Sequence, residues 1–222
     1  YPSSDKNVLE HISFTARRGE TVAFIGATGS GKTTLVSLAA RFYDATEGTV
    51  LVDGVDVRDY TFDALYDRIG YVTQKAILFS GDVRGNVLFG ASRGKDSDAD
   101  VQKALELAQA EGGTNVSGGQ KQRLSIARAL ARRPEILVFD DSFSALDYRT
   151  DTRLRAGLDR ELKDTTRLIV AQRIGTIRNA DKIIVLDEGR MVGMGTHEEL
   201  MQTCPIYQEI ARSQLSQEEL GA

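Results

Sequence analysis

A glycine-rich segment that ends in lysine and threonine has the residue types and spacing that bind phosphate groups. Residues 26–33 read Gly-Ala-Thr-Gly-Ser-Gly-Lys-Thr and fit the pattern G-x-x-x-x-G-K-[ST]. Glycines let backbone N–H groups approach phosphate oxygens closely, and the N-terminus of a following helix adds its positive dipole. Lys32 can supply a charge for the β- and γ-phosphates, and the Thr33 hydroxyl can bind Mg²⁺. A chance glycine turn is disfavoured, because the segment follows a strand-like run and opens a helix-like one.

An apolar run that ends in aspartate is the natural companion of this loop. Residues 136–139 are Ile-Leu-Val-Phe, and Asp140 follows them directly. A carboxylate at the end of a buried strand can hold a magnesium ion opposite the phosphate-binding loop. On its own, such a run would more often be core followed by a cap, but beside the glycine loop the metal role is the better hypothesis. The two segments together predict a site for a nucleotide and Mg²⁺.

A second glycine-containing segment leaves two interpretations open. Residues 116–120 read Val-Ser-Gly-Gly-Gln. If they open a helix, backbone N–H groups and the helix dipole make a second anion site. They are equally compatible with a loop that only caps the helix expected from Gln120 to Ala131.

The elements that position these segments alternate along the chain as in an α/β fold with a mostly parallel sheet. Asp53-Gly54 marks a hairpin, and strands are expected at 21–25, 136–139, 168–171 and 183–186. The stretch from about residue 76 to 133 has helical spacing instead, with one helix near 101–108 that Ser97 or Asp98 would cap. We therefore expect a nucleotide-binding core with a small antiparallel β-subdomain (1–73 and 134–222), interrupted by an α-helical subdomain (74–133).

Composition and charge exclude several classes of protein. The chain has 222 residues, of which 27% are charged and 41% hydrophobic, a globular composition. The formal net charge of −4 gives no basic field for nucleic acid. The single cysteine, Cys204, excludes an internal disulfide and fits a reducing compartment. The apolar runs are too short to span a bilayer and the first residue is Tyr1, so we expect a soluble piece of a longer polypeptide.

Taken together, the motifs resemble the nucleotide-binding domain of ABC transporters, particularly ABC exporters, over essentially the whole chain. Residues 26–34 match the Walker A motif and residues 136–140 the Walker B strand of that P-loop NTPase fold. Residues 117–120 match the family's signature motif, with Val116 where leucine is usual. Further matches are Gln74 in the Q-loop, residues 144–147 in the D-loop, and Tyr1 as the aromatic that stacks on adenine. The segment 76–79 with Asn86, and the tail 195–200, are typical of exporters.

The resemblance implies a head-to-tail dimer in which each ATP lies between the Walker motifs of one subunit and the signature motif of the other. It also implies transmembrane domains as partners, no nucleic acid, and a place at the cytoplasmic face of the cell membrane. The implied metal ligands are Thr33, Gln74 and Asp140, and the implied catalytic residues are Asp141, Gln172 and Gln74. The implied nucleotide contacts are Tyr1, Gly26, Thr28, Gly29, Ser30, Gly31, Lys32, Thr33, Thr34, Ser117, Gly118, Gly119, Gln120 and Asp147.

Two departures from the family pattern fall at the residues nearest the chemistry. Asp141 stands where the general base is usually glutamate, and it is shorter by one methylene. Gln172 stands where the switch-loop histidine is usual. A glutamine amide can form hydrogen bonds but cannot exchange a proton as imidazole does. Neither His11 nor His197 falls at an equivalent position.

These departures suggest an ATP site that binds nucleotide but hydrolyses it slowly. Because the signature motif looks intact, the chain resembles one half of a heterodimeric exporter, whose signature motif completes a competent site on a non-identical partner. The alternatives are an active homodimeric exporter, a soluble ABC ATPase that acts on nucleic acid without a membrane partner, and a regulatory ATP sensor. A further departure is that Ala110 runs directly into residues 111–115, where the family has an additional segment. Either the helical subdomain is shorter in this protein or a stretch has been left out of the sequence; we favour the missing stretch, because the flanks on both sides match the family.

Overall fold

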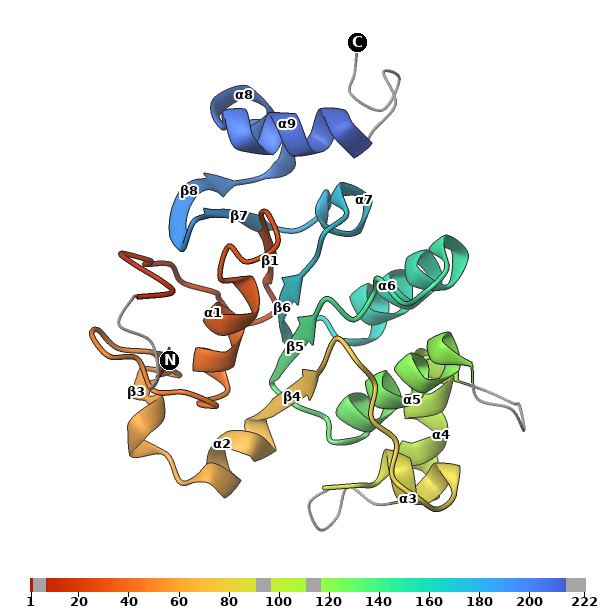
Figure 1. Cartoon of the computed structure of the whole chain (residues 1–222). Coiled ribbons are helices and arrows are strands. Elements are labelled where there is room, and N and C mark those ends of the chain that lie inside the picture. The colour runs from red at the N-terminus through yellow and green to blue at the C-terminus, as the bar shows by residue number, and fades with distance from the viewer. Residues whose placement is uncertain (2–6, 91–96, 111–116, 215–222) are drawn as a thin grey trace.

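A six-stranded sheet forms the centre of the molecule, here seen in a computed structural model that describes residues 1, 7–90, 97–110 and 117–214 (Figure 1). Its strand order is β4-β5-β6-β1-β7-β8. All neighbours are parallel except β7 and β8, which form an antiparallel edge. The strands are β1 (Thr21–Ile25), β4 (Ile69–Val72), β5 (Ile136–Asp140), β6 (Thr166–Val170), β7 (Lys182–Asp187) and β8 (Arg190–Gly195).

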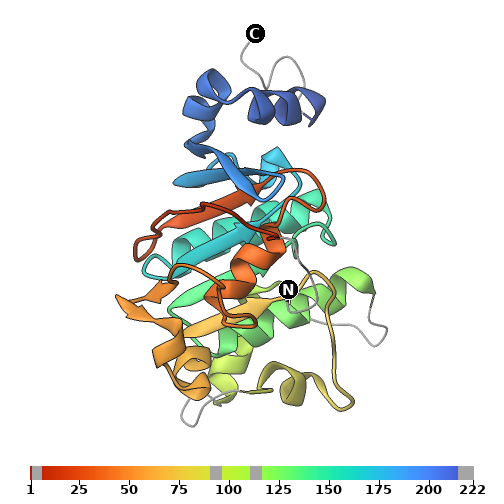
Figure 2. The same cartoon turned by 60° about the vertical axis from the view of Figure 1, so that its left-hand side comes forward.

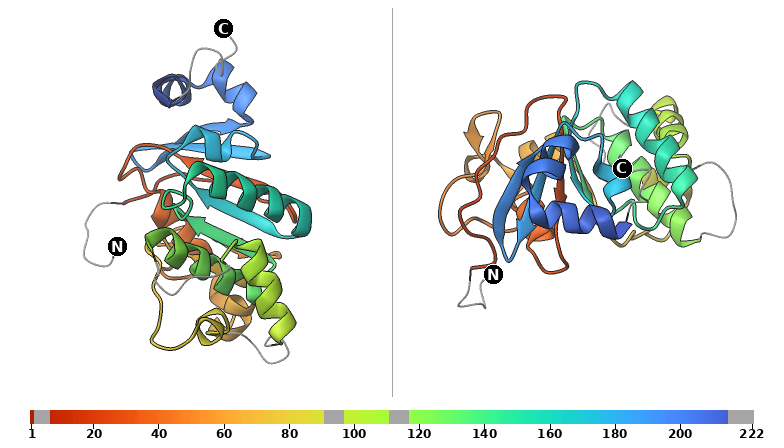
Figure 3. Two further views of the ribbon diagram at one scale, coloured as in Figure 1. Left: turned by 90° about the vertical axis from the view of Figure 1, so that its right-hand side faces the viewer. Right: turned by 90° about the horizontal axis from the view of Figure 1, so that it is seen from above.

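Hydrophobic clusters cover both faces of this sheet, because successive side chains of a strand point to opposite faces. In β1, Ala23 and Ile25 belong to one cluster, and Val22 and Phe24 to the other. Helix α1 (Lys32–Ala39) packs on the second face, while α5 (Gly118–Ala131) and α6 (Tyr148–Glu161) pack on the first. The strands lie between these layers in the view along the sheet (Figure 3). The strands are buried on both sides, as expected of a parallel sheet.

A small antiparallel sheet lies beside the core, as the sequence predicts. It consists of β2 (Leu51–Val52) and β3 (Val55–Asp56), followed by the short 3₁₀ helix η1 (Val57–Asp59) and helix α2 (Phe62–Arg68). The turn residues Asp53 and Gly54 have φ angles of 51° and 78°. Both angles lie in the left-handed region that an Asp-Gly hairpin turn requires.

The helical part lies below the sheet in Figure 2 and contains α3 (Val83–Val87), α4 (Asp98–Leu107) and α5. Ser97 caps α4 by accepting a hydrogen bond from the Asp100 amide, so of the two cap candidates the structure selects Ser97. The fold class is thus confirmed: a P-loop type α/β core, a mostly parallel sheet, a small antiparallel sheet and a helical portion. The domain boundaries at residues 74 and 133 stay a prediction.

The helices of the C-terminal region are α7 (Ile174–Ile177), α8 (His197–Thr203) and α9 (Pro205–Gln214). Thr196 and Glu199 form a capping box at the start of α8, as the spacing of Thr-x-x-Glu in the sequence predicts. Tyr207 and Ala211 hold α9 against the core and are fully buried. Over the part of the chain that the structure describes, no helix has the length and apolar character needed to cross a membrane.

Candidate functional site

The phosphate loop (residues 26–33) connects the end of β1 to the first turn of α1. Helix α1 begins at Lys32, two residues earlier than the apolar spacing indicates, so Lys32 and Thr33 belong to its first turn. The Lys32 ammonium donates hydrogen bonds to the Gly26 and Ala27 carbonyl oxygens, both at 2.7 Å, and to Ser30 Oγ at 3.3 Å. Burial lowers the pKa of Lys32, and the nearby carboxylates of Asp141 and Asp140 oppose that shift. The loop therefore curls around its own lysine.

Two glycines of the phosphate loop are required by the close approach of other atoms. A Cβ on Gly26 would lie 2.0 Å from the Leu186 carbonyl oxygen, and a Cβ on Gly31 would lie 2.5 Å from Leu9 Cδ2. Their φ angles, 153° and 97°, are also ones that other residues rarely adopt. At Gly26 the clashing atom is a backbone oxygen, so the loop requires glycine there, whereas at Gly31 the Leu9 side chain can shift and the φ angle is what favours glycine.

A buried carboxylate stands opposite the start of α1. Asp140, at the end of β5, accepts a hydrogen bond from Thr33 Oγ1 at 2.8 Å on Oδ1 and one from the Tyr71 hydroxyl at 3.2 Å on Oδ2. Burial raises the pKa of Asp140, and the bonds from Thr33 and Tyr71 act against this shift. A hydroxyl and a carboxylate side by side are the hard oxygen donors that Mg²⁺ prefers, so these residues fit a magnesium–nucleotide site.

The residues proposed to act in catalysis meet at a single carboxylate oxygen. Gln74 Nε2 donates to Asp141 Oδ2 at 2.9 Å, and Gln172 Nε2 donates to the same oxygen at 2.7 Å. These residues follow β4, β5 and β6, which are neighbours in the sheet, so their carboxyl ends bring the side chains together. Asp141 is buried and has a φ angle of 50°, a left-handed conformation that aspartate adopts more readily than most residues.

The signature loop (residues 117–120) starts α5 on the opposite face of the sheet from α1. Ser117 Oγ accepts a hydrogen bond from the Gln120 amide, and Gln120 Oε1 accepts one from the Ser117 amide. This capping box uses both side chains for the helix itself. Within one chain the signature loop and the phosphate loop thus serve different helices on different sides of the sheet. Val116 lies outside the described residues.

The remaining sequence candidates occupy exposed positions. Asp147 caps α6 by accepting hydrogen bonds from the backbone amide and hydroxyl of Thr150, which lower its pKa. The Tyr1 hydroxyl lies 2.7 Å from Thr34 Oγ1, and its ring meets that of Tyr43 edge to face at 4.9 Å. Thr28 and Gly29 are exposed at the tip of the phosphate loop. The structure tests none of these nucleotide contacts directly.

Sequence reasoning missed two polar side chains near the site. The first is Tyr71, whose hydroxyl bonds to Asp140; a tyrosine in a strand gives no signal that separates this role from ordinary packing. The second is Gln122 of α5, which is 1% exposed and donates to the Thr73 carbonyl oxygen at 3.0 Å. A signal existed for Gln122, because it lies on the same helical face as the buried Ile126 and Ala129.

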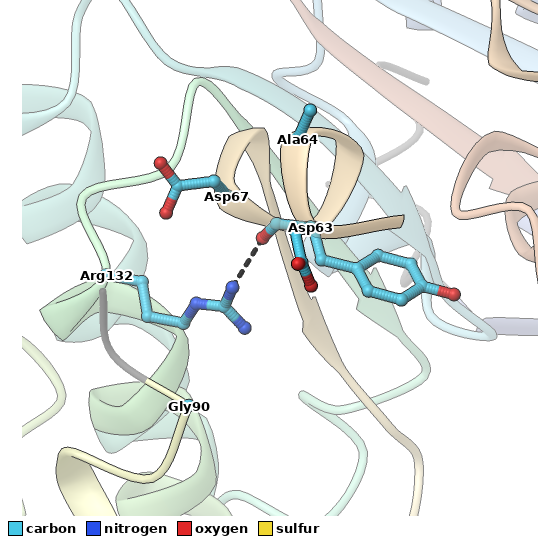
Figure 4. A pocket seen from close by; sticks show the side chains of 6 residues that line it. Asp63, Ala64, Asp67, Gly90 and Arg132 are labelled. Atoms are coloured by element: carbon cyan, nitrogen blue, oxygen red, sulfur yellow. Dashed lines mark hydrogen bonds between the residues drawn. The ribbon is translucent and has the colours of Figure 1, made fainter. Parts of the chain in front are cut away.

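At the amino end of β4, away from the carboxyl ends of the strands where the site lies, the surface between α2 and the helical part is hollowed. A cavity of about 540 Å³ is lined by Asp63, Ala64, Tyr66, Asp67, Gly90 and Arg132 (Figure 4). Arg132 reaches from the end of α5 and donates to the Tyr66 carbonyl oxygen at 2.6 Å.

A smaller hollow of about 250 Å³ shares Gly90 and Arg132 with the first. Over it, Phe79 and Phe89 stack at 4.0 Å and remain substantially exposed, and the Arg128 guanidinium lies 5.0 Å from the Phe79 ring. Apolar rings beside two hollows give this face the character of a contact surface.

Comparison with known proteins places these features in one family. A family model described as "ABC transporter" matches residues 9–144. An uncharacterized ABC transporter ATP-binding protein of Mycobacterium tuberculosis is 50% identical over 229 residues, with 96% of this chain and 39% of the relative covered. An ATP-dependent lipid A-core flippase of Syntrophus aciditrophicus is 40% identical, with 98% of this chain and 38% of the relative covered.

A solved structure of a bacterial Atm1-family ABC exporter with ATP bound has a TM-score of 0.88 and 34% identity, over 96% of this chain and 40% of that one. The chain thus spans about two fifths of the length of the relatives it matches. The alignment to the mycobacterial relative, 229 positions, is longer than the 222 residues here, so that relative carries residues that this chain lacks.

Proposed function

This chain belongs to the ABC transporter family and has the fold of an exporter-type nucleotide-binding domain, and from that premise we propose that it binds ATP with Mg²⁺ to drive export. The observation that carries the proposal is the pairing of Thr33 with Asp140 across from the loop closed by Lys32. Thr33 and Asp140, with Gln74, would hold the metal. Lys32 would leave the loop carbonyls for the β- and γ-phosphates. Bound Mg²⁺ supplies charge neutralisation between the phosphates.

We further propose that this ATP site turns over slowly. Asp141 occupies the position that the general base has in the family, and its Oδ2 already accepts hydrogen bonds from Gln74 and Gln172. The shorter side chain holds the free oxygen farther from the substrate than glutamate would. Gln172 offers an amide, which has no second protonation state. A positioned general base contributes roughly 10²–10⁴-fold, or about 3–5 kcal/mol of barrier.

The place of the signature loop supports a dimer. Its helix packs on the opposite face of the sheet from α1, and its side chains cap their own helix. The capping box uses the Ser117 and Gln120 amides, so the Gly118 and Gly119 N–H groups of this 14-residue helix would be the ones to receive an anion from another subunit. We propose a head-to-tail partner with glutamate and histidine at the positions of Asp141 and Gln172, whose site this loop completes.

The second partner we propose is the transmembrane part of the exporter. The relatives are about two and a half times as long as the portion matched here, since it covers 38–40% of them. The exposed rings of Phe79 and Phe89, which line the smaller hollow, offer apolar surface to a membrane domain. This face includes the segment that follows Gln74, so contact there can reach the ATP site. The domain would then lie at the cytoplasmic face of the membrane.

The test is ATP hydrolysis by the purified protein at high concentration beside the double change Asp141→Glu with Gln172→His. We expect the unchanged protein to bind a fluorescent ATP analogue but to hydrolyse ATP slowly. The double change should raise turnover on the order of tenfold or more, with affinity nearly unchanged, because it restores a base and a proton-exchanging side chain. Each single change, and the double change combined with Lys32→Ala, serve as controls.

Brisk turnover by the unchanged protein would overturn the slow-site proposal and favour an active homodimer. Loss of ATP binding in the unchanged protein would overturn the function as a whole. Turnover stimulated by DNA and independent of a membrane would favour the class of ABC ATPases that act on nucleic acid.

A further inference from the structure

The side chain of Gln214, at the end of α9, forms two hydrogen bonds with the backbone of the loop that carries Gln172. Its Oε1 accepts a hydrogen bond from the Ile174 amide at 2.9 Å, and its Nε2 donates to the Gln172 carbonyl oxygen at 2.8 Å. Through these two bonds, the side-chain amide of Gln214 pairs with the backbone at residues 172 and 174 in the way that a neighbouring β-strand would. It therefore fixes the backbone on both sides of Arg173.

One of these bonds replaces a missing helix cap. Arg173 is the N-cap residue of α7 and makes no side-chain capping hydrogen bond. The first N–H groups of a helix have no partner within the helix and need one from elsewhere. Gln214 supplies that partner to Ile174 from 40 residues away. The start of α7 thus depends on a helix at the other end of this region.

Helix α9 is itself firmly held, so it can serve as an anchor. Tyr207, Ala211 and Gln214 are spaced four and three residues apart and lie on one face of the helix. Tyr207 and Ala211 are fully buried, and the Tyr207 hydroxyl lies 2.8 Å from His197 Nδ1. Gln208 donates to the Met201 carbonyl oxygen, which ties α9 to α8. Gln214 extends the anchored face to the loop.

Gln214 holds the backbone of Gln172, whose side chain contacts Asp141, the proposed general base. The Gln172 side chain donates to Asp141 Oδ2, while its own carbonyl oxygen is held by Gln214. We propose that Gln214 is a positioning residue, which sets the backbone at residues 172–174 so that the residue 172 side chain reaches Asp141. This proposal rests on the proposed function, since it assigns α9 a part in the same ATP site.

The experiment compares Gln214→Ala with Gln214→Glu in the intact protein. Glutamate keeps an acceptor for the Ile174 amide but cannot donate to the Gln172 carbonyl oxygen. Gln208→Ala is the matched control, because it removes a glutamine bond on the same helix that points to α8. Hydrogen exchange is followed in the peptide that covers residues 172–178 and in the β6 peptide, residues 166–170. Turnover is measured with and without Asp141→Glu and Gln172→His, which leave the backbone bonds in place.

We expect Gln214→Ala to speed exchange of the Ile174 amide about tenfold, as loss of hydrogen bonds of ordinary strength predicts. The β6 peptide should not change. In the background with restored turnover, kcat should fall severalfold with KM for ATP unchanged, because only the geometry at residue 172 is disturbed. Gln214→Glu should retain part of the Ile174 protection, and Gln208→Ala should leave both kcat and the Ile174 exchange rate as they are.

Unchanged Ile174 exchange in Gln214→Ala would overturn the proposal, and so would faster exchange without a change in kcat. A drop in kcat equal to that of Gln208→Ala would also overturn it, since loosening of α9 would then be enough. Failure of the unchanged protein to bind ATP is a different result: it overturns the proposed function and is seen in the nucleotide titration before any variant is compared.

Discussion

The phosphate loop and the signature loop are both glycine-rich and both open a helix, yet they use their polar groups differently. In the phosphate loop, Lys32 is buried and donates hydrogen bonds to carbonyl oxygens of its own loop. Thr33 donates a hydrogen bond to Asp140 at the carboxyl end of β5. In the signature loop, the Ser117 and Gln120 side chains each accept a hydrogen bond from the other residue's backbone amide, and Ser117 and Gly118 are exposed.

The contrast between the two loops shows how much of a binding site a single chain can build by itself. The phosphate loop has a cation, a hydroxyl and a carboxylate assembled from distant parts of the sequence. The signature loop has a capped helix N-terminus, and among the described residues a Cβ on Gly119 would lie 3.5 Å from the Ala145 carbonyl oxygen and 3.8 Å from Arg123 Nη1. The first has the parts of a site within one chain, and under the proposed function the second becomes a site only when another subunit brings its nucleotide.

The largest effect should come from Lys32→Ala. Hydrogen bonds from a charged group contribute about 1.5–3 kcal/mol each, so ATP affinity should fall roughly a hundredfold or more. A titration with a fluorescent ATP analogue measures it. Lys121→Ala, an exposed lysine in the first turn of α5, is the control and should leave affinity unchanged. If the two variants lost affinity equally, the contrast between the loops would be false.

A smaller effect is expected at Gln122, which joins the helix of the signature loop to the segment before Gln74. Its buried amide bonds the helix of the signature loop to the Thr73 carbonyl oxygen, next to Gln74. Gln122→Ala leaves that carbonyl without this partner and opens a small cavity, so the free energy of unfolding should fall by about 1–3 kcal/mol. Urea unfolding measures the loss. Gln102→Ala, on the exposed face of α4, should cost far less; equal losses would show that Gln122 is not a link.

The smallest change in stability should follow Ser117→Ala, which removes one cap and costs about 1 kcal/mol. Ser117→Asp sharpens the test, because aspartate keeps the cap but brings a negative charge to the proposed anion site. We expect Ser117→Asp to retain stability and to leave ATP binding by the single chain intact, while it suppresses turnover of the dimer. Unaltered dimer turnover in Ser117→Asp would show that no phosphate approaches this loop.

Local sequence was enough to predict the pieces of the fold that neighbouring residues decide. The strand before the phosphate loop, the Asp53-Gly54 hairpin, the capping box at Thr196 and the cap at Ser97 all formed as expected, because each depends on residues within a few positions of one another. The helices α2, α3, α6 and α7 were not specified in advance. In α6, charged residues dilute the apolar face that packs on the core.

The amino-acid sequence alone was enough to predict the motifs and the order of the elements that carry them. Only the tertiary structure decided which side chains meet at Asp141, that Tyr71 bonds to Asp140, and that Gln214 caps α7. These contacts arise because β4, β5 and β6 are parallel neighbours in the sheet. The loops at their carboxyl ends converge although the contacting residues are 31 and 67 positions apart, and no local pattern records which strands pair.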